Sequence, residues 1–469
     1  MKMLALALRN LLRNRRRSLT TMLAMIVGAH TVLLFGGYCR NITYGLQTDY
    51  VKFGGHLQIQ RAGYYRWGSG DPAAYGIAAY RDMLATLRSD PVLAPMLAVA
   101  TPTLQLQGIA GNFAAGVSRT ALAQGLVVDD QNRMRAWNDY AFPVQLAPLA
   151  LTGTGPEAAI VGLGLARVLQ LCAPLRLADC APPAASRREA AGADLPGDLV
   201  ALAGSTAEAA APAGGAAAPA GGAGIELLAA TARGAPNVAR LDVVKAEDQF
   251  VKEFDDVYVG LHLEQAQRLV YGREPPRATA ILVQLRHTSQ LPAARARITE
   301  LLASRFPAEP TEVLDFTVLN PFYGQALAMF ATLFGFVAVL IGAIVLFTVG
   351  NTMSTAVVER TVEIGTLRAL GLRRAGIRRL FLCEGFLLGL AGAVLGVFSA
   401  AALAGLINHS GLTWTPPGRS PVPLIIRVWG ETELIAGTTL ALVVVALLSA
   451  WWPARRAARL QIVDALRHV

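Results

Sequence analysis

Charged residues and cysteines are both scarce in this sequence. Of its 469 residues, 16% are Asp, Glu, Lys or Arg and 54% are hydrophobic, whereas soluble domains contain about 25% charged residues. An ordinary soluble protein is therefore not expected. Four cysteines in a chain of this length are too few to form the framework of a disulfide-stabilised secreted domain.

The motifs of several enzyme classes are also missing. The sequence contains no G-x-x-x-x-G-K-[ST] phosphate loop, which excludes ATP binding by that route. It contains no H-E-x-x-H or C-x-x-C metal-site pattern and no G-x-S-x-G nucleophile motif. We therefore predict that the chain is not an enzyme and that it has no catalytic residues, no metal site and no cofactor of its own.

Long apolar runs, in contrast, are abundant. The core of a bilayer is about 30 Å thick and requires about 20 apolar residues in a helix. Four segments meet this requirement, and we predict transmembrane helices at residues 19–39, 327–352, 380–407 and 434–452. The apolar run of the first helix is longer than that of a signal peptide, so we expect it to be retained as an anchor.

Basic residues concentrate in the short segments beside these helices. Residues 1–18, 353–379 and 453–469 together contain 16 Lys and Arg residues and three acidic residues. Because short cytoplasmic segments are enriched in Lys and Arg, we predict that these segments, and both termini, are cytoplasmic. The segment 40–326 and the loop 408–433 are then extracytoplasmic. The net charge of +10 thus reflects membrane topology, and we expect no nucleic-acid partner.

The long segment 40–326 has the mixed pattern of an α+β domain. Apolar periodicity predicts, in order, a strand at 56–60, a helix at 77–87, a strand at 280–285, a helix at 292–304 and a strand at 312–319. Residues 181–224 are so rich in Ala, Gly and Pro that we predict a flexible loop there. The predicted fold class is an α-helical membrane protein with four transmembrane helices and a large extracytoplasmic α+β domain between the first two.

Two of the four cysteines, Cys172 and Cys180, lie in this outer segment, eight residues apart. In an oxidising compartment they would form a disulfide bond that closes a short loop. The alternative, two unpaired buried thiols, stays open.

The third predicted transmembrane helix contains two pairs of glycines four residues apart, Gly385 with Gly389 and Gly392 with Gly396. Small residues at this spacing let membrane helices approach closely, so we predict that both pairs are helix-packing positions. The single charged residue of this helix, Glu384, is expected to reach the membrane interface or to pair with a nearby arginine.

The cytoplasmic link 353–379 carries the most informative pattern. Glu359 and Glu363 are four residues apart, which places both carboxylates on one face of a predicted helix beside Ile364. Gly371 is suited to the end of that helix. Such an amphipathic helix either lies against anionic lipid or docks into a partner protein, and the physical pattern alone leaves both interpretations open.

The pattern E-R-x-x-E-I-G-x-x-R-A-L-G, from Glu359 to Gly371, resembles the coupling segment of FtsX-like ABC transporter permeases. This family includes the lipoprotein-releasing permeases and the macrolide exporter MacB. Residues 9–17 are similar to the amphipathic lead-in of the family, and 55–59 to the strand that begins the outer domain of the lipoprotein-releasing branch. The tail after residue 453 is also similar, although Val463 stands where the family usually has proline.

The resemblance implies a permease subunit that works with a separate ABC ATPase subunit, which binds ATP and Mg. It also implies a second permease copy, as homodimer or heterodimer, in a bacterial inner membrane. ATP-driven closure of the ATPase would push the coupling segment and move the outer domain mechanically. The residues that it assigns to ATPase coupling are Glu359, Arg360, Glu363, Ile364, Gly365, Arg368 and Gly371.

The resemblance leaves the substrate open. The leading hypothesis is extraction or export of a lipoprotein, a lipid or another amphipathic substrate, with membrane lipids and a periplasmic lipoprotein carrier as further partners. One alternative is the permease of a tripartite efflux pump, which needs a periplasmic adaptor. Another is an FtsX-like signalling scaffold that controls a cell-wall hydrolase.

Overall fold

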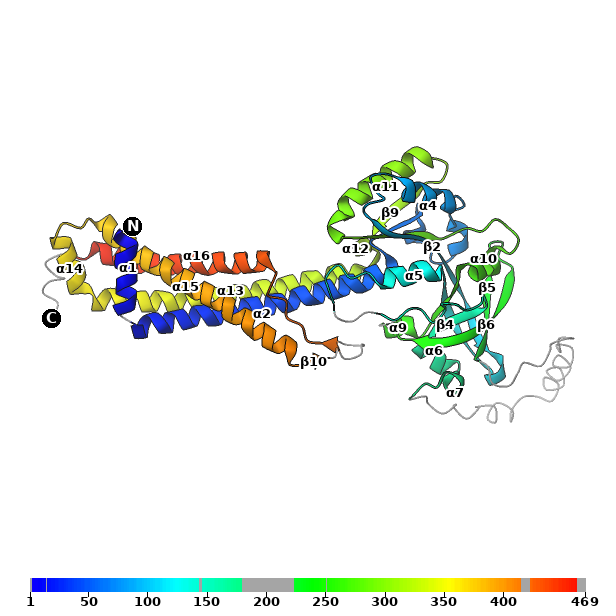
Figure 1. Ribbon diagram of the computed structural model, residues 1–469, viewed down its shortest axis with the longest axis horizontal. Coiled ribbons are helices and arrows are strands. Elements are labelled where there is room, and N and C mark those ends of the chain that lie inside the picture. The colour runs from blue at the N-terminus through cyan, green and yellow to red at the C-terminus, as the bar shows by residue number, and fades with distance from the viewer. Residues whose placement is uncertain are drawn as a thin grey trace, which may run out of the picture. The chain divides into compact units, whose positions relative to one another are not determined.

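The computed structural model of the protein describes residues 2–13, 15–142, 146–178, 223–249, 251–414 and 422–461. It contains two compact units (Figure 1). The helical unit consists of Met1–Gln47 and Pro321–Val469, and the α/β unit consists of Thr48–Asn320. Almost all of the predicted flexible loop 181–224 lies outside the described residues.

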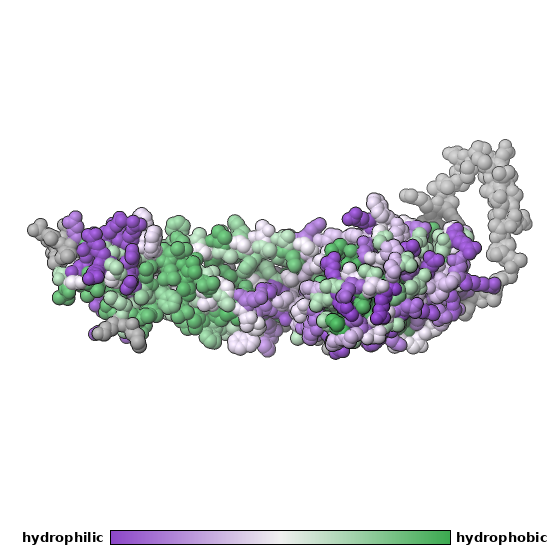
Figure 2. Space-filling model, turned by 90° about the horizontal axis from the view of Figure 1, so that it is seen from above, coloured by the Kyte–Doolittle hydropathy of each residue, from purple (hydrophilic) through white to green (hydrophobic). Residues whose placement is uncertain are grey.

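Four long helices dominate the helical unit, and all four are long and apolar enough to cross a membrane. They are α2 (Arg15–Gly54), α13 (Pro321–Glu359), α15 (Arg374–His409) and α16 (Thr432–Arg459). Hydrophobic residues form a broad band over these helices, whereas hydrophilic residues gather at the end of the unit that carries the short helices α1 and α14 (Figure 2). Four membrane helices were predicted, and the part of the chain that the structure describes contains four candidates in the same order.

The helices are longer than the apolar runs that predicted them. Helix α2 has 40 residues and α13 has 39, so each is about 60 Å long, twice the thickness of a bilayer core. Helix α16 does not end at residue 452 but continues through the buried Pro453 to Arg459. Hydropathy identifies the apolar part of a helix that can lie in the lipid, but it does not detect the polar turns that extend the helix at either end.

Inside the helical unit, α15 packs closely against both α16 and α2. Its contacts belong to an apolar core that includes Met25, Ala29, Val349, Leu388 and Ala446. Helix α13 contributes less to this core, because few of its most apolar residues are buried in the unit. Large side chains along it therefore remain exposed: Phe336, Val339 and Phe347.

The α/β unit contains a four-stranded antiparallel sheet built from two β-α-β segments. The first segment is β1 (Leu57–Arg61), α4 (Tyr80–Ser89) and β2 (Leu97–Asn112), and the second is β8 (Ala280–Leu285), α11 (Leu291–Arg305) and β9 (Thr311–Asp315). The strand order is β2-β8-β1-β9. Apolar side chains of both helices and of the strands form one core, among them Leu57, Ile59, Leu87, Ile281 and Ile298.

The second half of β2 continues into a ring of strands. Residues Leu104–Asn112 of β2 pair with β3 (Val117–Leu126) and, in part, with β5 (Gly224–Ala230). The pairings run on through β7 (Tyr258–His262), β4 (Ala158–Gly162) and β6 (Pro236–Glu247) and close the ring at β5. Helices α6 (Leu163–Val168) and α10 (Leu263–Tyr271) pack on its core.

The remaining elements among the described residues are short. They are α1 (Lys2–Arg13), α3 (Tyr64–Trp67), α5 (Val128–Arg135), α7 (Cys172–Leu175), α9 (Lys252–Asp255), α12 (Phe316–Leu319), α14 (Thr361–Ala369), β10 (Thr413–Trp414) and β11 (Val422–Pro423), with 3₁₀ turns at Pro72–Tyr75, Phe113–Ala115 and Thr288–Gln290.

The predicted strand 312–319 is too long. The strand β9 ends at Asp315, whose carboxylate accepts hydrogen bonds from the backbone N–H groups of Thr317 and Val318, both at 3.1 Å. Aspartate at this position is an N-cap, so it begins the short helix α12 instead of extending the strand. The predicted strand 280–285 coincides with β8.

The segment that leads into β1 is held by Gly55 and His56. Gly55 has φ of +74°, and a Cβ atom there would lie 2.8 Å from the carbonyl oxygen of Val283, so glycine is required. His56 is fully buried, and its Nδ1 accepts a hydrogen bond from the backbone N–H of Leu285 at 3.0 Å. Its ring meets that of Trp137 edge to face, with centroids 5.0 Å apart. These two residues therefore shape the fold.

Candidate coupling site

The predicted coupling residues lie between α13 and α15, in the segment Glu359–Gly371, here named the coupling segment. Glu359 is the last residue of α13, and Arg360 lies between α13 and α14. The other residues occupy α14 and the turn after it: Glu363, Ile364, Gly365, Arg368 and Gly371. The structure thus brings these residues together at one end of the helical unit (Figure 1).

The helix that was predicted to carry both glutamates is broken at Arg360, which has φ of −99° and ψ of 15°. The hydroxyl of Thr361 lies 2.7 Å from the carbonyl oxygen of Val358 and 3.1 Å from that of Val357. Hydroxyl groups bonded back to the preceding turn often bend helices. Glu359 and Glu363 therefore belong to two helices, so the prediction of one continuous helix is wrong, although both side chains face the N-terminal segment.

Each of these glutamates is paired with an arginine of the N-terminal segment. Glu359 pairs with Arg17 of α2, and Glu363 pairs with Arg13, the last residue of α1. The hydrogen bond from Arg17 holds the pKa of the Glu359 carboxyl below its usual value. The side chains of both glutamates are about half exposed, so the pairs lie at the surface, where ion pairs contribute little to stability.

A second set of polar contacts lies deeper. Arg360 donates from Nη1 to the carboxylate of Glu384 in α15, at 3.0 Å to Oε1 and 3.3 Å to Oε2. Asn10 of α1 donates from Nδ2 to the same Oε1 at 2.8 Å, and the backbone carbonyl oxygen of Asn10 accepts from Nη2 of Arg360 at 3.2 Å. The side chains of Arg360 and Glu384 are only 9% and 3% exposed. Three segments of the chain thus meet in one closed set of hydrogen bonds.

The remaining coupling residues hold α14 against the ends of α15 and α16. Ile364 is 3% exposed and packs in a cluster with Ile377, Phe381 and Ala454. Gly365 is also buried, and Arg368 donates to the carbonyl oxygen of Leu460. One face of α14 is therefore used inside the unit.

The opposite face of α14 is exposed and partly apolar. Val362 is 46% exposed and Leu370, which follows the helix, is 80% exposed. Thr366 lies between them and is exposed as well. Gly371 has φ of +96° and ends the segment in a turn, as glycine often does after a helix. A partner protein can reach this face, as it can reach the half-exposed Glu359 and Glu363.

The glycines of α15 contact two different helices. A Cβ atom on Gly385 would lie 2.7 Å from the Cβ of Ala450, and one on Gly389 would lie 2.9 Å from the Cβ of Ala446, both in α16. The other pair contacts α2. A Cβ atom on Gly392 would lie 2.7 Å from the Cβ of Met25, and one on Gly396 would lie 2.4 Å from the Cβ of Ala29. Each pair thus lets one neighbouring helix approach closely.

Two residues that sequence reasoning did not place in the site, Asn10 and Glu384, belong to its buried part. Glu384 carried a signal, because it is the single charge in a long apolar run and therefore needs a partner. Asn10 carried a weaker one, as an uncharged polar residue between leucines and arginines. Arg13 and Arg17 were noted for their charge but not for their partners.

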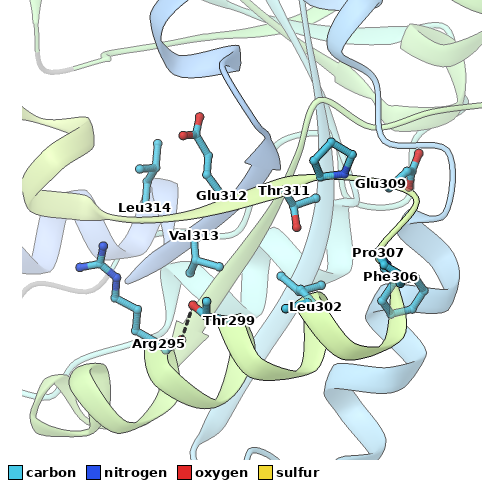
Figure 3. Close-up of a pocket in the computed structure, with 12 residues that line it drawn as sticks. Arg295, Thr299, Leu302, Phe306, Pro307, Glu309, Thr311, Glu312, Val313 and Leu314 are labelled. Carbon is cyan, nitrogen blue, oxygen red and sulfur yellow. Dashed lines mark hydrogen bonds between the residues drawn. The ribbon is translucent and has the colours of Figure 1, made fainter.

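Away from the coupling segment, a groove of about 560 Å³ lies between α11 and β9. Thr311 and Val313 point from the strand toward the helix, where Arg295, Leu302 and Phe306 line the other side (Figure 3). Arg295 is bound to Asp315 at 3.0 Å. The lining is a mixture of apolar and polar side chains, and one oxygen of Glu312 is buried there without a hydrogen-bond partner among the described residues.

The other predicted positions lie in the α/β unit. Cys172 begins α7, whereas Cys180 lies outside the described residues, so their disulfide bond stays a prediction. Cys39 and Cys383 are free thiols. Among the described residues, no group of three or more His, Cys, Asp and Glu side chains is placed to hold a metal ion.

Residues 327–462 match the family model of the FtsX-like permease C-terminal domain. The chain is 29% identical over 194 residues to the macrolide export ATP-binding/permease protein MacB of Rhodopirellula baltica, covering 40% of this chain and 26% of that protein. It is 27% identical over 243 residues to the lipoprotein-releasing system transmembrane protein LolC of Neisseria meningitidis, covering 50% and 56%.

A third relative is an uncharacterised ABC transporter permease of Methanocaldococcus jannaschii, 26% identical over 243 residues, with 48% of this chain and 57% of the relative covered. The chain thus spans between a quarter and a little over half of the length of these relatives. The resemblance to FtsX-like permeases that rests on Glu359–Gly371 is confirmed by the domain match.

Proposed function

We propose that this chain, which carries an FtsX-like permease domain, is the membrane subunit of an ABC transporter and works with a separate ATPase subunit. Four membrane-length helices and the named ABC relatives support this function. The chain lies in the cytoplasmic membrane of a bacterium, with both termini and the coupling segment on the cytoplasmic side, where ATP is available. The permease itself hydrolyses no ATP.

The observation that carries this proposal is the geometry of α14. The helix is fixed to the unit through Ile364 and exposes Val362, Thr366 and Leu370 on its other side. A short helix that is rigidly held and has an apolar outer face is suited to a groove on a partner protein. The ATPase subunit docks on this outer face, whereas Glu359 and Glu363 orient the segment through their arginine partners.

Co-purification with the ABC ATPase encoded nearest to this chain tests the docking face. We expect Leu370→Asp to reduce the amount of bound ATPase at least tenfold, because a carboxylate would have to be buried in the contact. Leu412→Asp is a matched control, since Leu412 is 54% exposed and lies in the loop 408–433 between α15 and α16. Equal binding by Leu370→Asp and the unmodified chain would contradict docking on this face.

The substrate class follows less directly from the structure. The sequence similarity to the lipoprotein-releasing branch at residues 55–59 lies in Gly55, the buried His56 and strand β1, which serve the fold. It therefore does not point to a substrate. The relatives' names include both macrolide export and lipoprotein release, and their common chemistry is amphipathic. We infer an amphipathic or lipid-bearing substrate that is taken from the outer leaflet.

The genes beside this one and the proteins that co-purify with the complex distinguish efflux from lipoprotein release. A periplasmic adaptor that co-purifies with the complex supports efflux, whereas a soluble lipoprotein carrier supports lipoprotein release. Two copies of the permease, or one copy with a second permease, complete the transporter. The exposed apolar side chains of α13, among them Phe336 and Phe347, face lipid or the second permease.

A further inference from the structure

We propose that Asn10, Arg360 and Glu384 are positioning residues that fasten α1 and α14 to α15, so that these three elements move as one body. If the proposed function holds, an ATPase subunit that pushes on α14 then moves the cytoplasmic end of α15 directly. The three residues are named here the lock.

Burial is the first argument for the lock. Arg360 and Glu384 are both charged, and their side chains are 9% and 3% exposed. Buried ion pairs give little net stability compared with apolar residues of similar size, but removing one partner leaves the other charge uncompensated. A pair of this kind therefore strongly disfavours any arrangement in which Arg360 leaves Glu384, and so fixes the geometry around it.

The second argument is that the hydrogen bonds among the three residues form a closed ring. Arg360 donates from Nη1 to Glu384 and from Nη2 to the backbone carbonyl oxygen of Asn10, while the side-chain Nδ2 of Asn10 donates to Glu384. Each residue is bonded to the other two, and the three come from α1, the α13–α14 junction and α15. Lysine has a single nitrogen on a flexible stem and lacks the planar fork of arginine, so it cannot reproduce both bonds in this geometry.

The third argument is position. Arg360 is the residue at which the helix breaks between α13 and α14. Without a lock, α14 could tilt at this break about its packing contact at Ile364, while α13 and α15 stay in place. The surface pairs of Glu359 with Arg17 and of Glu363 with Arg13 flank the lock, but they are exposed and hold the same segments less firmly.

Limited proteolysis of the purified full chain in detergent tests the lock without any partner. Trypsin can cut α1 after Arg9 and Arg13 once α1 detaches. We expect Asn10→Leu and Arg360→Lys to accelerate cleavage there about tenfold, because hydrogen bonds to charged groups commonly account for such a factor. Ser399→Ala is the control, since that hydroxyl bonds only to carbonyl groups of α15 itself.

The ATPase complex supplies a second measurement that a purely structural role would not change. With the ATPase subunit bound, we expect Arg360→Lys to lower kcat for ATP hydrolysis at least fivefold while KM for ATP stays within about twofold. Asn10→Leu leaves both buried charges paired, so it provides the same test if a variant of Arg360 fails to fold.

The outcomes separate the lock from the proposed function. Cleavage rates of Asn10→Leu and Arg360→Lys within twofold of the unmodified chain would overturn the lock. Faster cleavage with unchanged kcat would overturn the transmission of motion through it. Faster cleavage together with no ATPase bound by the unmodified chain would support the lock and reject the proposed function.

Discussion

Arg360 and Glu384, 24 residues apart in sequence, form an ion pair in which one guanidinium nitrogen contacts both carboxylate oxygens, at 3.0 and 3.3 Å. The pair joins the junction of α13 and α14 to α15. Within the coupling segment, Arg360 and Ile364 hold the segment in place, whereas Val362 and Leu370 face outward. The motif Glu359–Gly371 thus combines both roles within 13 residues.

The surface ion pairs give the first prediction. Reversing Glu359 and Glu363 to arginine places like charges beside Arg17 and Arg13, so we expect the ATPase subunit to bind several-fold more weakly. Reversing Arg13 and Arg17 to glutamate in the same chain restores opposite charges, and binding measured by co-purification is expected to recover. If the variant with all four substitutions binds the ATPase as weakly as the variant with only the two glutamates reversed, the two glutamates contact the ATPase directly.

The packing of α15 gives the second prediction. A leucine at Gly396 has no room, because a Cβ there would lie 2.4 Å from that of Ala29, whereas Gly405 on the same helix has no atom within 4 Å of such a position. We expect Gly396→Leu to lower the free energy of unfolding by about 1–3 kcal/mol, as overpacking does. Thermal unfolding in detergent measures this, with Gly405→Leu as control. Similar melting of the two variants would show that α2 and α15 separate easily.

Local patterns in the sequence predicted the elements whose formation is local. The apolar runs predicted the four membrane-length helices, and the short apolar run Ala280–Leu285 predicted β8. The ring of strands was not predicted, because its pairings join segments far apart in sequence: Gly108 of β2, for example, lies opposite Ala229 of β5. Such pairings depend on tertiary packing, which periodicity does not contain.

The candidate site divides in the same way. The motif identified the coupling segment, but the partners of its charges are remote, since Arg13 and Glu363 are 350 residues apart. The break at Arg360 was missed because a spacing of four residues predicts a shared face only if the helix is continuous. Thr361 bonds back to the preceding turn, but Thr352 and Thr355 do the same inside the continuous helix α13, so the residue type alone did not mark the break.

The buried histidine of the α/β unit gives the third prediction, which concerns pH. Burial lowers the pKa of His56 from 6.5 to about 4, so the neutral ring is favoured in the folded state. Between these two values the unfolded chain binds more protons than the folded one, and stability falls as pH decreases. The contribution of the neutral His56 to the free energy of unfolding is nearly complete at pH 7.5. About 2 kcal/mol of this contribution is lost when the pH falls to 5.

Hydrogen exchange at the backbone N–H of Leu285 measures this change locally, because that N–H donates to Nδ1 of His56. Protonation of the ring removes the acceptor, so we expect protection at Leu285, corrected for intrinsic exchange, to decrease about thirtyfold from pH 7.5 to 5. In His56→Asn the amide oxygen supplies an acceptor that does not titrate, and protection is expected to be nearly constant. An equal decrease in both chains would mean that another group controls the opening of β8 at low pH.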